Sequence, residues 1–259
     1  MRPVYQILEC LNDSLQDVMC AVRLLKRLGG SGLDRRKVKR LALLQSQRMS
    51  ALREKVIVAA VVTASILIFY FGSLYSTVFD PILIPNTRID RAIPFLPIFV
   101  IPYFSYYFFL LSPMFIIHDL ESFRETAFGI GMIVMVSCVV FFFWPTAITT
   151  SFTDPLLRAL LAVDRPRNAC PSLHASLTQF CALTMHRHIR SKAGRSALWG
   201  WTALIIASTL FTKRHAVIDI AVGMAFGWSV YQWIIAPRLP ATSAIDGVAD
   251  AECEGIPEV

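Results

Sequence analysis

Apolar residues gather in six blocks along the chain, separated by short polar connections. The blocks cover roughly residues 56–77, 95–117, 127–147, 171–187, 197–212 and 216–236. A helix needs about 20 mostly apolar residues to cross the hydrocarbon core of a bilayer, and the blocks reach or approach that length. The fourth and fifth are short, which is typical of spans that pack against other helices around a cavity. The pattern predicts an all-α, polytopic membrane protein built as a six-transmembrane-helix bundle.

The two ends of the chain differ from these blocks. Apolar positions between residues 4 and 25 follow the spacing of one helix face, and a basic stretch then leads into the first block. We therefore predict N-terminal cytoplasmic helices in a basic region over 1–54, a six-helix membrane domain over 55–240, and an acidic disordered tail over 241–259. The basic side of 1–54 either serves only to set topology, which we favour, or lies on anionic lipid.

Composition agrees with a membrane protein. Hydrophobic residues make up 55% of the chain and charged residues 17%, with a mean hydropathy of +0.56, whereas a soluble domain carries about 25% charged residues. This excludes a disordered chain, a disulfide scaffold and a nucleic-acid module. The net charge of +7 is first a matter of membrane topology.

The distribution of Lys and Arg predicts the orientation. With a cytoplasmic N-terminus, 18 of these residues lie on the inner side and seven on the outer side. The positive-inside rule therefore places both termini in the cytoplasm.

Most of the outer cations accompany two short motifs at the outer membrane boundary. The first runs from Asp164 to His174 and enters the fourth block, and the second runs from Thr212 to Asp219 and enters the sixth. His215 and Asp219 are four residues apart, so they lie on one helix face. A carboxylate on one imidazole nitrogen leaves the other free as a nucleophile or base. His174 is then available as an acid.

The same motifs contain groups that suit a phosphate. Pro171 and Ser172 predict a helix start, where free N–H groups and the helix dipole favour an anion. The cations Lys213, Arg214, Arg165 and Arg167 supply the positive field that phosphoryl transfer requires. A zinc site formed by His174, His215 and Asp219 is the competing interpretation, but cations beside a dication are unfavourable. We predict no metal and no cofactor.

These residues resemble the type 2 phosphatidate phosphatase superfamily. They are most similar to its lipid phosphotransferase branch, which includes inositol phosphorylceramide and sphingomyelin synthases. The branch pattern is Pro-Ser-Leu-His followed by His-x-x-x-Asp, present here at 171–174 and 215–219. Asn168 also matches the branch and joins the predicted phosphate-binding group. The resemblance covers roughly residues 80–236.

The resemblance implies an outward-facing, metal-independent site in a six-helix bundle. It makes His215 the nucleophile that forms a phosphohistidine, Asp219 the residue that orients it, and His174 the acid that protonates the leaving oxygen. The superfamily has Ser-Arg six residues ahead of the nucleophile, whereas this chain has Ser208-Thr209. Arg214 is the expected substitute for that arginine.

We therefore predict an integral-membrane lipid phosphotransferase or lipid phosphate phosphatase. Its site would be extracytoplasmic, which means periplasmic in a bacterium and luminal in a eukaryote. The expected partners are membrane lipids, namely a phospholipid or lipid phosphate and a ceramide or diacylglycerol acceptor, and not nucleic acid. Water or an alcohol could be the acceptor. A non-enzymatic lipid carrier or scaffold and a metal-dependent hydrolase remain as alternatives.

Overall fold

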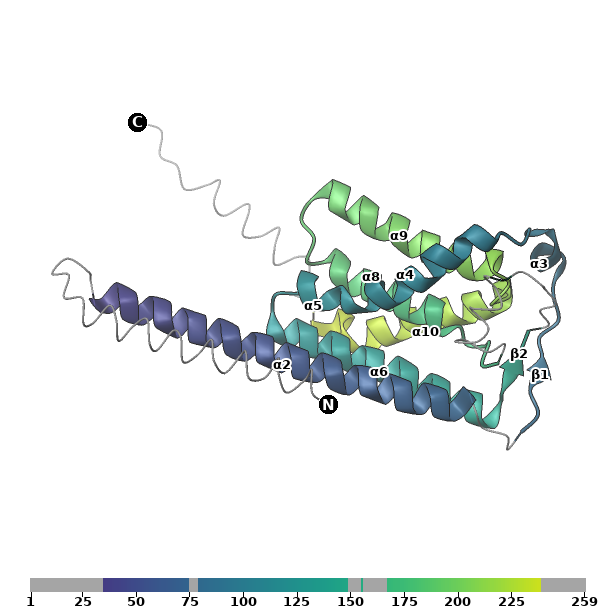
Figure 1. Cartoon of the computed structure of the whole chain (residues 1–259), viewed down its shortest axis with the longest axis horizontal. Helices are drawn as coiled ribbons and strands as arrows, with labels where there is room; N and C mark the ends of the chain where they lie inside the picture. The colour runs from purple at the N-terminus through teal and green to yellow at the C-terminus, as the bar shows by residue number, and fades with distance from the viewer. Residues whose placement is uncertain (1–34, 75–78, 149–154, 156–166, 239–259) are drawn as a thin grey trace. The chain divides into compact units, whose positions relative to one another are not determined.

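The structure is a computed structural model that describes residues 35–74, 79–148, 155 and 167–238 (Figure 1). The first 34 residues, the predicted tail over 241–259 and Arg165 lie outside the described residues. The chain forms two compact units, Met1–Val61 and Val62–Val259. The domain boundaries predicted near residues 54 and 240 stay predictions.

The described part of the chain is mostly helical, as predicted. In chain order its elements are α2 (Arg35–Leu74), β1 (Ile82–Leu83), α3 (Arg88–Ala92), η1 (Pro97–Phe99), α4 (Val100–Leu111), α5 (Pro113–Ile116), α6 (Leu120–Phe143), β2 (Thr146–Ala147), α8 (Leu173–His186), α9 (Lys192–Phe211), α10 (Val217–Ile234) and η2 (Ala236–Arg238). Each predicted apolar block overlaps at least one of these helices.

Three helical stretches among the described residues are long and apolar enough to cross a membrane. They are Pro97–Ile116, Leu120–Phe143 and Val217–Ile234, and they match the second, third and sixth predicted blocks. The length and composition of these three helices indicate that the protein is associated with a membrane. The six-span count and the sidedness of the termini stay predictions.

Local sequence signals explain where the bundle helices begin. Asp119 caps α6 by accepting a hydrogen bond from Ser122 N at 2.7 Å, and Ser191 caps α9 by accepting one from Gly194 N at 3.1 Å. Ser172 caps α8 in the same way. Each cap pairs an N–H group that has no partner inside its own helix.

Helix α8 is the centre of the bundle. It contacts α4, α5, α6, α9 and α10 (Figure 1), and most of its residues are buried. Its 14 residues span only about 21 Å at 1.5 Å per residue. The surrounding helices shield it, which agrees with the prediction that the fourth block packs against other helices.

Helices α8 and α10 approach each other through small residues. A Cβ atom added to Gly223 would lie 2.5 Å from the Ser172 carbonyl oxygen, and one added to Gly227 would collide with the Ser176 carbonyl oxygen. Pairs of small residues four apart therefore face each other on the two helices. This arrangement allows two helix backbones to pack closely inside a membrane.

A small sheet joins the connections that lead to the site. Strands β1 and β2 pair in parallel, with Ile82 opposite Thr146. Ala147 also bridges to Arg167, and Cys170 N donates to the Thr146 hydroxyl at 2.8 Å. The segment before α8 is thereby held against the end of α6.

The helix contact yields the first prediction. Gly227→Ala should separate α8 from α10 and destabilise the protein by about 1–3 kcal/mol, because overpacking a close contact costs energy of that order. Thermal unfolding in detergent micelles, followed by tryptophan fluorescence, should show a lower midpoint. Gly131→Ala is the matched control, since nothing lies within 4 Å of its added Cβ. Equal midpoints for the two variants would contradict the close contact.

Candidate active site

The segment between α9 and α10 has a conformation set by the end of α9. Thr212 is the C-cap of the helix. Arg214 N donates to Thr209 O at 2.9 Å and Lys213 N donates to Leu210 O at 3.0 Å, which is the Schellman pattern. Lys213 occupies the left-handed position of this motif with a φ of 55°, where glycine is the usual residue. The turn places His215 immediately before α10.

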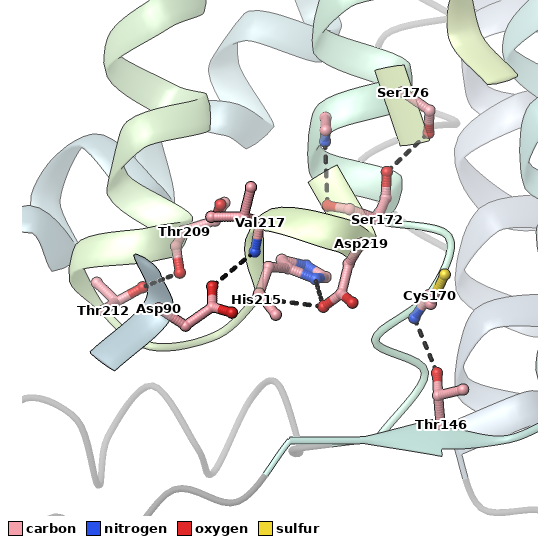
Figure 2. Close-up of polar contacts among 12 residues, drawn as sticks. Asp90, Thr146, Cys170, Ser172, Ser176, Thr209, Thr212, His215, Val217 and Asp219 are labelled. Atoms are coloured by element: carbon pink, nitrogen blue, oxygen red, sulfur yellow. Dashed lines mark hydrogen bonds and ion pairs between the residues drawn. The ribbon is translucent and has the colours of Figure 1, made fainter. Parts of the chain in front are cut away.

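His215 and Asp219 lie together at the start of α10 (Figure 2). The predicted reason, a shared helix face, was wrong, because His215 precedes the N-cap Ala216 and lies outside the helix. His215 Nδ1 is 3.5 Å from Asp219 Oδ2, and the side chains are 7% and 0% exposed. This separation is longer than a well-formed hydrogen bond. Asp219 Oδ2 also accepts a hydrogen bond from Ala216 N at 2.9 Å, which fixes the carboxylate.

His174 reaches the same place from the first turn of α8. Ser172 N donates to the Asp219 carbonyl oxygen at 3.2 Å, which ties the start of α8 to the start of α10. The ring centroids of His174 and His215 are 5.8 Å apart. Two motifs separated by about forty residues of sequence therefore bring two buried imidazoles and one carboxylate together.

The His174 ring lies between two tyrosines of α4. Its centroid is 4.4 Å from that of Tyr103 and 4.1 Å from that of Tyr106, with interplanar angles of 33° and 34°. Both tyrosines are buried, whereas the neighbouring Tyr107 is 45% exposed. Packing of the imidazole against two buried aromatic rings restricts its orientation.

The predicted phosphate-binding residues occupy different environments. Arg214 is 6% exposed and precedes His215 directly. Asn168 is buried with a φ of 61°, a left-handed conformation that asparagine tolerates well. The Ser172 hydroxyl accepts from Ala175 N at 3.3 Å, so it serves as a helix cap.

The remaining predicted cations point to backbone carbonyls. Arg167 donates to Phe79 O at 3.4 Å. The Lys213 ammonium donates to Asp90 O at 2.6 Å and also to Ile93 O. These bonds connect Lys213 to α3 and to its C-cap residue Ile93.

Sequence reasoning missed Asp90. Its Oδ1 atom accepts a hydrogen bond from Val217 N at 2.8 Å, and its Oδ2 atom accepts from the Thr87 hydroxyl at 2.6 Å. Burial alone would raise the pKa of Asp90. Hydrogen bonds from the Thr87 hydroxyl, from Val217 N and from Thr87 N, together with the charge of Lys213, hold that pKa below its ordinary value of 3.8. The Thr-x-x-Asp spacing of a capping box was the available signal.

Cys170 is close enough to the site for Asp219 to affect it. Burial first, and the negative charge of Asp219 second, raise the pKa of the Cys170 thiol. The thiolate is the nucleophilic form of cysteine, so the raised pKa makes this thiol a poor nucleophile. Among the described residues, no group of three or more His, Cys, Asp or Glu side chains is arranged to hold a metal ion.

Comparison with known proteins identifies the family. A family model described as the PAP2 superfamily matches residues 78–233, which is more than half of the chain. The protein therefore belongs to the type 2 phosphatidate phosphatase superfamily, whose members are generally phosphatases or phosphotransferases. No curated protein and no solved structure matches the chain. The predicted superfamily is confirmed, and the narrower inositol phosphorylceramide and sphingomyelin synthase branch stays a prediction.

The Asp90 carboxylate yields a prediction about pH. Because its pKa is lowered in the folded protein, Asp90 stabilises the fold above pH 3.8 and loses this contribution as the pH falls through its folded-state value. Asp90→Asn should lower the thermal midpoint by a few degrees at pH 7, as expected for about 1–3 kcal/mol from one lost buried hydrogen bond. The difference in thermal midpoint between the variant and the unmodified protein should become smaller below about pH 4. If the difference in midpoint stayed constant down to pH 3, the Asp90 side chain would not be the charged group that stabilises the fold.

Proposed function

We propose that the protein is an integral-membrane lipid phosphotransferase or lipid phosphate phosphatase that works through a phosphohistidine and without a metal. The observation that carries this proposal is the placement of His215, backed by Asp219, with its ring 5.8 Å from that of His174. The superfamily match supports phosphatase or phosphotransferase chemistry on a phosphorylated lipid or small molecule. The finer assignment rests on the chemistry of these three side chains.

In the first step, His215 Nε2 attacks the phosphorus of the lipid phosphate in line with the leaving oxygen. The new P–N bond forms as the P–O bond to the leaving group breaks. Asp219 lies at the other ring nitrogen, where it stabilises the positive charge that develops on the imidazole. His174 donates its proton to the departing alcohol oxygen, so no alkoxide is released.

In the second step, water or an alcohol attacks the phosphohistidine. His174, now neutral, accepts the proton of the attacking hydroxyl as the P–N bond breaks and His215 regains its electron pair. Water yields a phosphate product, and a lipid alcohol yields a new phospholipid. The resemblance to the synthase branch favours transfer to an alcohol such as ceramide or diacylglycerol.

Arg214 is the cation best placed to stabilise the transferred phosphoryl group. It is buried beside His215, and a guanidinium in a site shielded from water interacts strongly with phosphate oxygens. Asn168 can add a hydrogen bond from the segment before α8. Arg165 and Arg167 remain candidates for the outer part of the substrate headgroup. This site would lie on the extracytoplasmic face, with both termini in the cytoplasm.

The proposal is tested with purified protein in detergent micelles containing EDTA. Phosphatidate and phosphatidylinositol are supplied with or without ceramide or diacylglycerol, and phosphate release and new phospholipid are measured. His215→Asn should abolish turnover, because an asparagine amide cannot form the covalent intermediate. His118→Asn is the matched control, since His118 is exposed and lies just before α6. This control should keep full activity.

The outcomes separate the alternatives. Acid-labile phosphate bound to the unmodified protein, and lost in His215→Asn, would support the phosphohistidine. Activity that appears only after zinc replaces EDTA would favour a metal-dependent hydrolase and overturn the proposal. Lipid transfer between vesicles without turnover, unchanged in His215→Asn, would favour a carrier.

The tyrosines around His174 yield a separate prediction. Tyr106→Leu should slow turnover of phosphatidate by about tenfold or more, because a misplaced acid loses part of the 10²–10⁴-fold benefit of proton donation. The pre-steady-state burst of p-nitrophenolate from p-nitrophenyl phosphate should change much less, since p-nitrophenolate leaves without a proton in the first step. Tyr106→Phe keeps the ring and should retain most of the activity. Equal losses on both substrates would contradict a role through the acid.

A further inference from the structure

The backbone around His215 is held by residues on both sides. Within the segment 87–96, which we call the brace, Leu96 N donates to Phe211 O at 3.0 Å. The Lys213 ammonium donates to Asp90 O and Ile93 O, and Asp90 Oδ1 accepts from Val217 N. The brace therefore contacts the connection between α9 and α10 at Phe211, Lys213 and Val217. His215 lies between the last two of these contacts.

Asp90 acts as a cap for a helix in another part of the chain. Helix α10 begins with N–H groups that have no partner inside the helix. Asp219 accepts from Ala216 N, and Asp90 accepts from Val217 N, so two carboxylates from distant segments share the start of this helix (Figure 2).

Asp90 is itself held in place. Its Oδ2 atom accepts from Thr87 N at 2.8 Å and from the Thr87 hydroxyl at 2.6 Å, while Asp90 N donates back to that hydroxyl at 3.2 Å. The side chain is buried, so water competes little for these bonds. A carboxylate with both oxygens engaged provides a rigid point of attachment.

Lys213 adopts a backbone conformation that a lysine seldom adopts. Left-handed φ values are unfavourable for residues with a side chain, and glycine usually takes this helix-end position. A residue kept in such a conformation requires compensation from its surroundings. Here the compensation is visible, because only a long cationic side chain could reach the two brace carbonyls.

From these contacts we propose that the brace positions the nucleophile, with Asp90 and Lys213 as positioning residues for His215. The proposal rests on the proposed function of His215. It gives Lys213 a different task from phosphate binding, since its ammonium is engaged by the brace. In-line attack requires the nucleophile within a narrow range of positions, and a displacement of about 1 Å can cost about 10²-fold in rate. The contribution should therefore appear in kcat.

The first test replaces Asp90 with asparagine. The amide has one carbonyl oxygen, so either Val217 N or Thr87 N loses its acceptor. We expect kcat to fall about 10- to 100-fold with a KM change below about threefold, because positioning acts on the chemical step. Hydrogen–deuterium exchange should rise about tenfold in peptides covering 212–217 and stay unchanged in α6. Asp80→Asn is the matched control on the same connection, where the side chain is exposed.

The second test replaces Lys213 with glycine. Glycine suits the left-handed backbone better than lysine, so a purely local backbone role predicts equal or greater stability and full activity. If the brace positions His215, the variant should have a lower kcat and faster hydrogen–deuterium exchange over 88–93, even if its thermal midpoint rises. If Lys213 instead binds the substrate phosphate, its loss should raise KM. If Asp90→Asn fails to fold, this variant carries the test.

The outcomes distinguish the brace from the proposed function. Unchanged kcat and unchanged exchange in both variants, with His215→Asn inactive, would overturn the brace and leave the phosphohistidine standing. An active His215→Asn would overturn the proposed function and, with it, the role of the brace in catalysis. A raised KM with unchanged kcat in Lys213→Gly would return Lys213 to the phosphate site and overturn its positioning role.

Discussion

The close approach of α8 and α10 is the contact on which the site depends. His174 lies in the first turn of α8 and His215 lies just before α10. The N-terminal ends of the two helices must therefore lie at the same level for these side chains to meet. Gly223 and Gly227 allow this because they have no side chain to separate the backbones from Ser172 and Ser176. Between membrane helices, packing of this kind replaces the hydrophobic effect as the source of association. The hydrogen bond from Ser172 N to the Asp219 carbonyl oxygen then sets the register.

Around this contact the protein buries charged groups and gives them fixed partners. Asp219 and Asp90 both accept backbone N–H groups at the start of α10, and Lys213 donates to backbone carbonyls. Burying an unpaired charge is costly, whereas a charge held by several hydrogen bonds becomes a rigid element. The site therefore combines two functions of charge. Some groups hold the backbone in place, and under the proposed function Arg214 and the two histidines act on the substrate.

This division suits phosphoryl transfer. The reaction demands positioning and electrostatic stabilisation more than elaborate covalent chemistry. Under the proposed function, the nucleophile His215 is held between the brace and α10, and the acid His174 packs against two tyrosines of α4. Membership of the type 2 phosphatidate phosphatase superfamily agrees with a phosphorylated lipid or small-molecule substrate.

The sequence by itself determined the helical class and the superfamily, because apolar blocks and short motifs are local patterns. It also predicted that His174, His215 and Asp219 lie together, since the predicted topology placed both motifs at the same membrane boundary. Only the tertiary structure decided what Lys213 and Asp90 do. Their bonds join segments more than a hundred residues apart, and no local period encodes such a contact. The sequence pattern made no distinction among the four cations of the two motifs and assigned all of them to phosphate binding. In the structure, Lys213 and Arg167 donate to backbone carbonyls, where their charges meet partial negative charge.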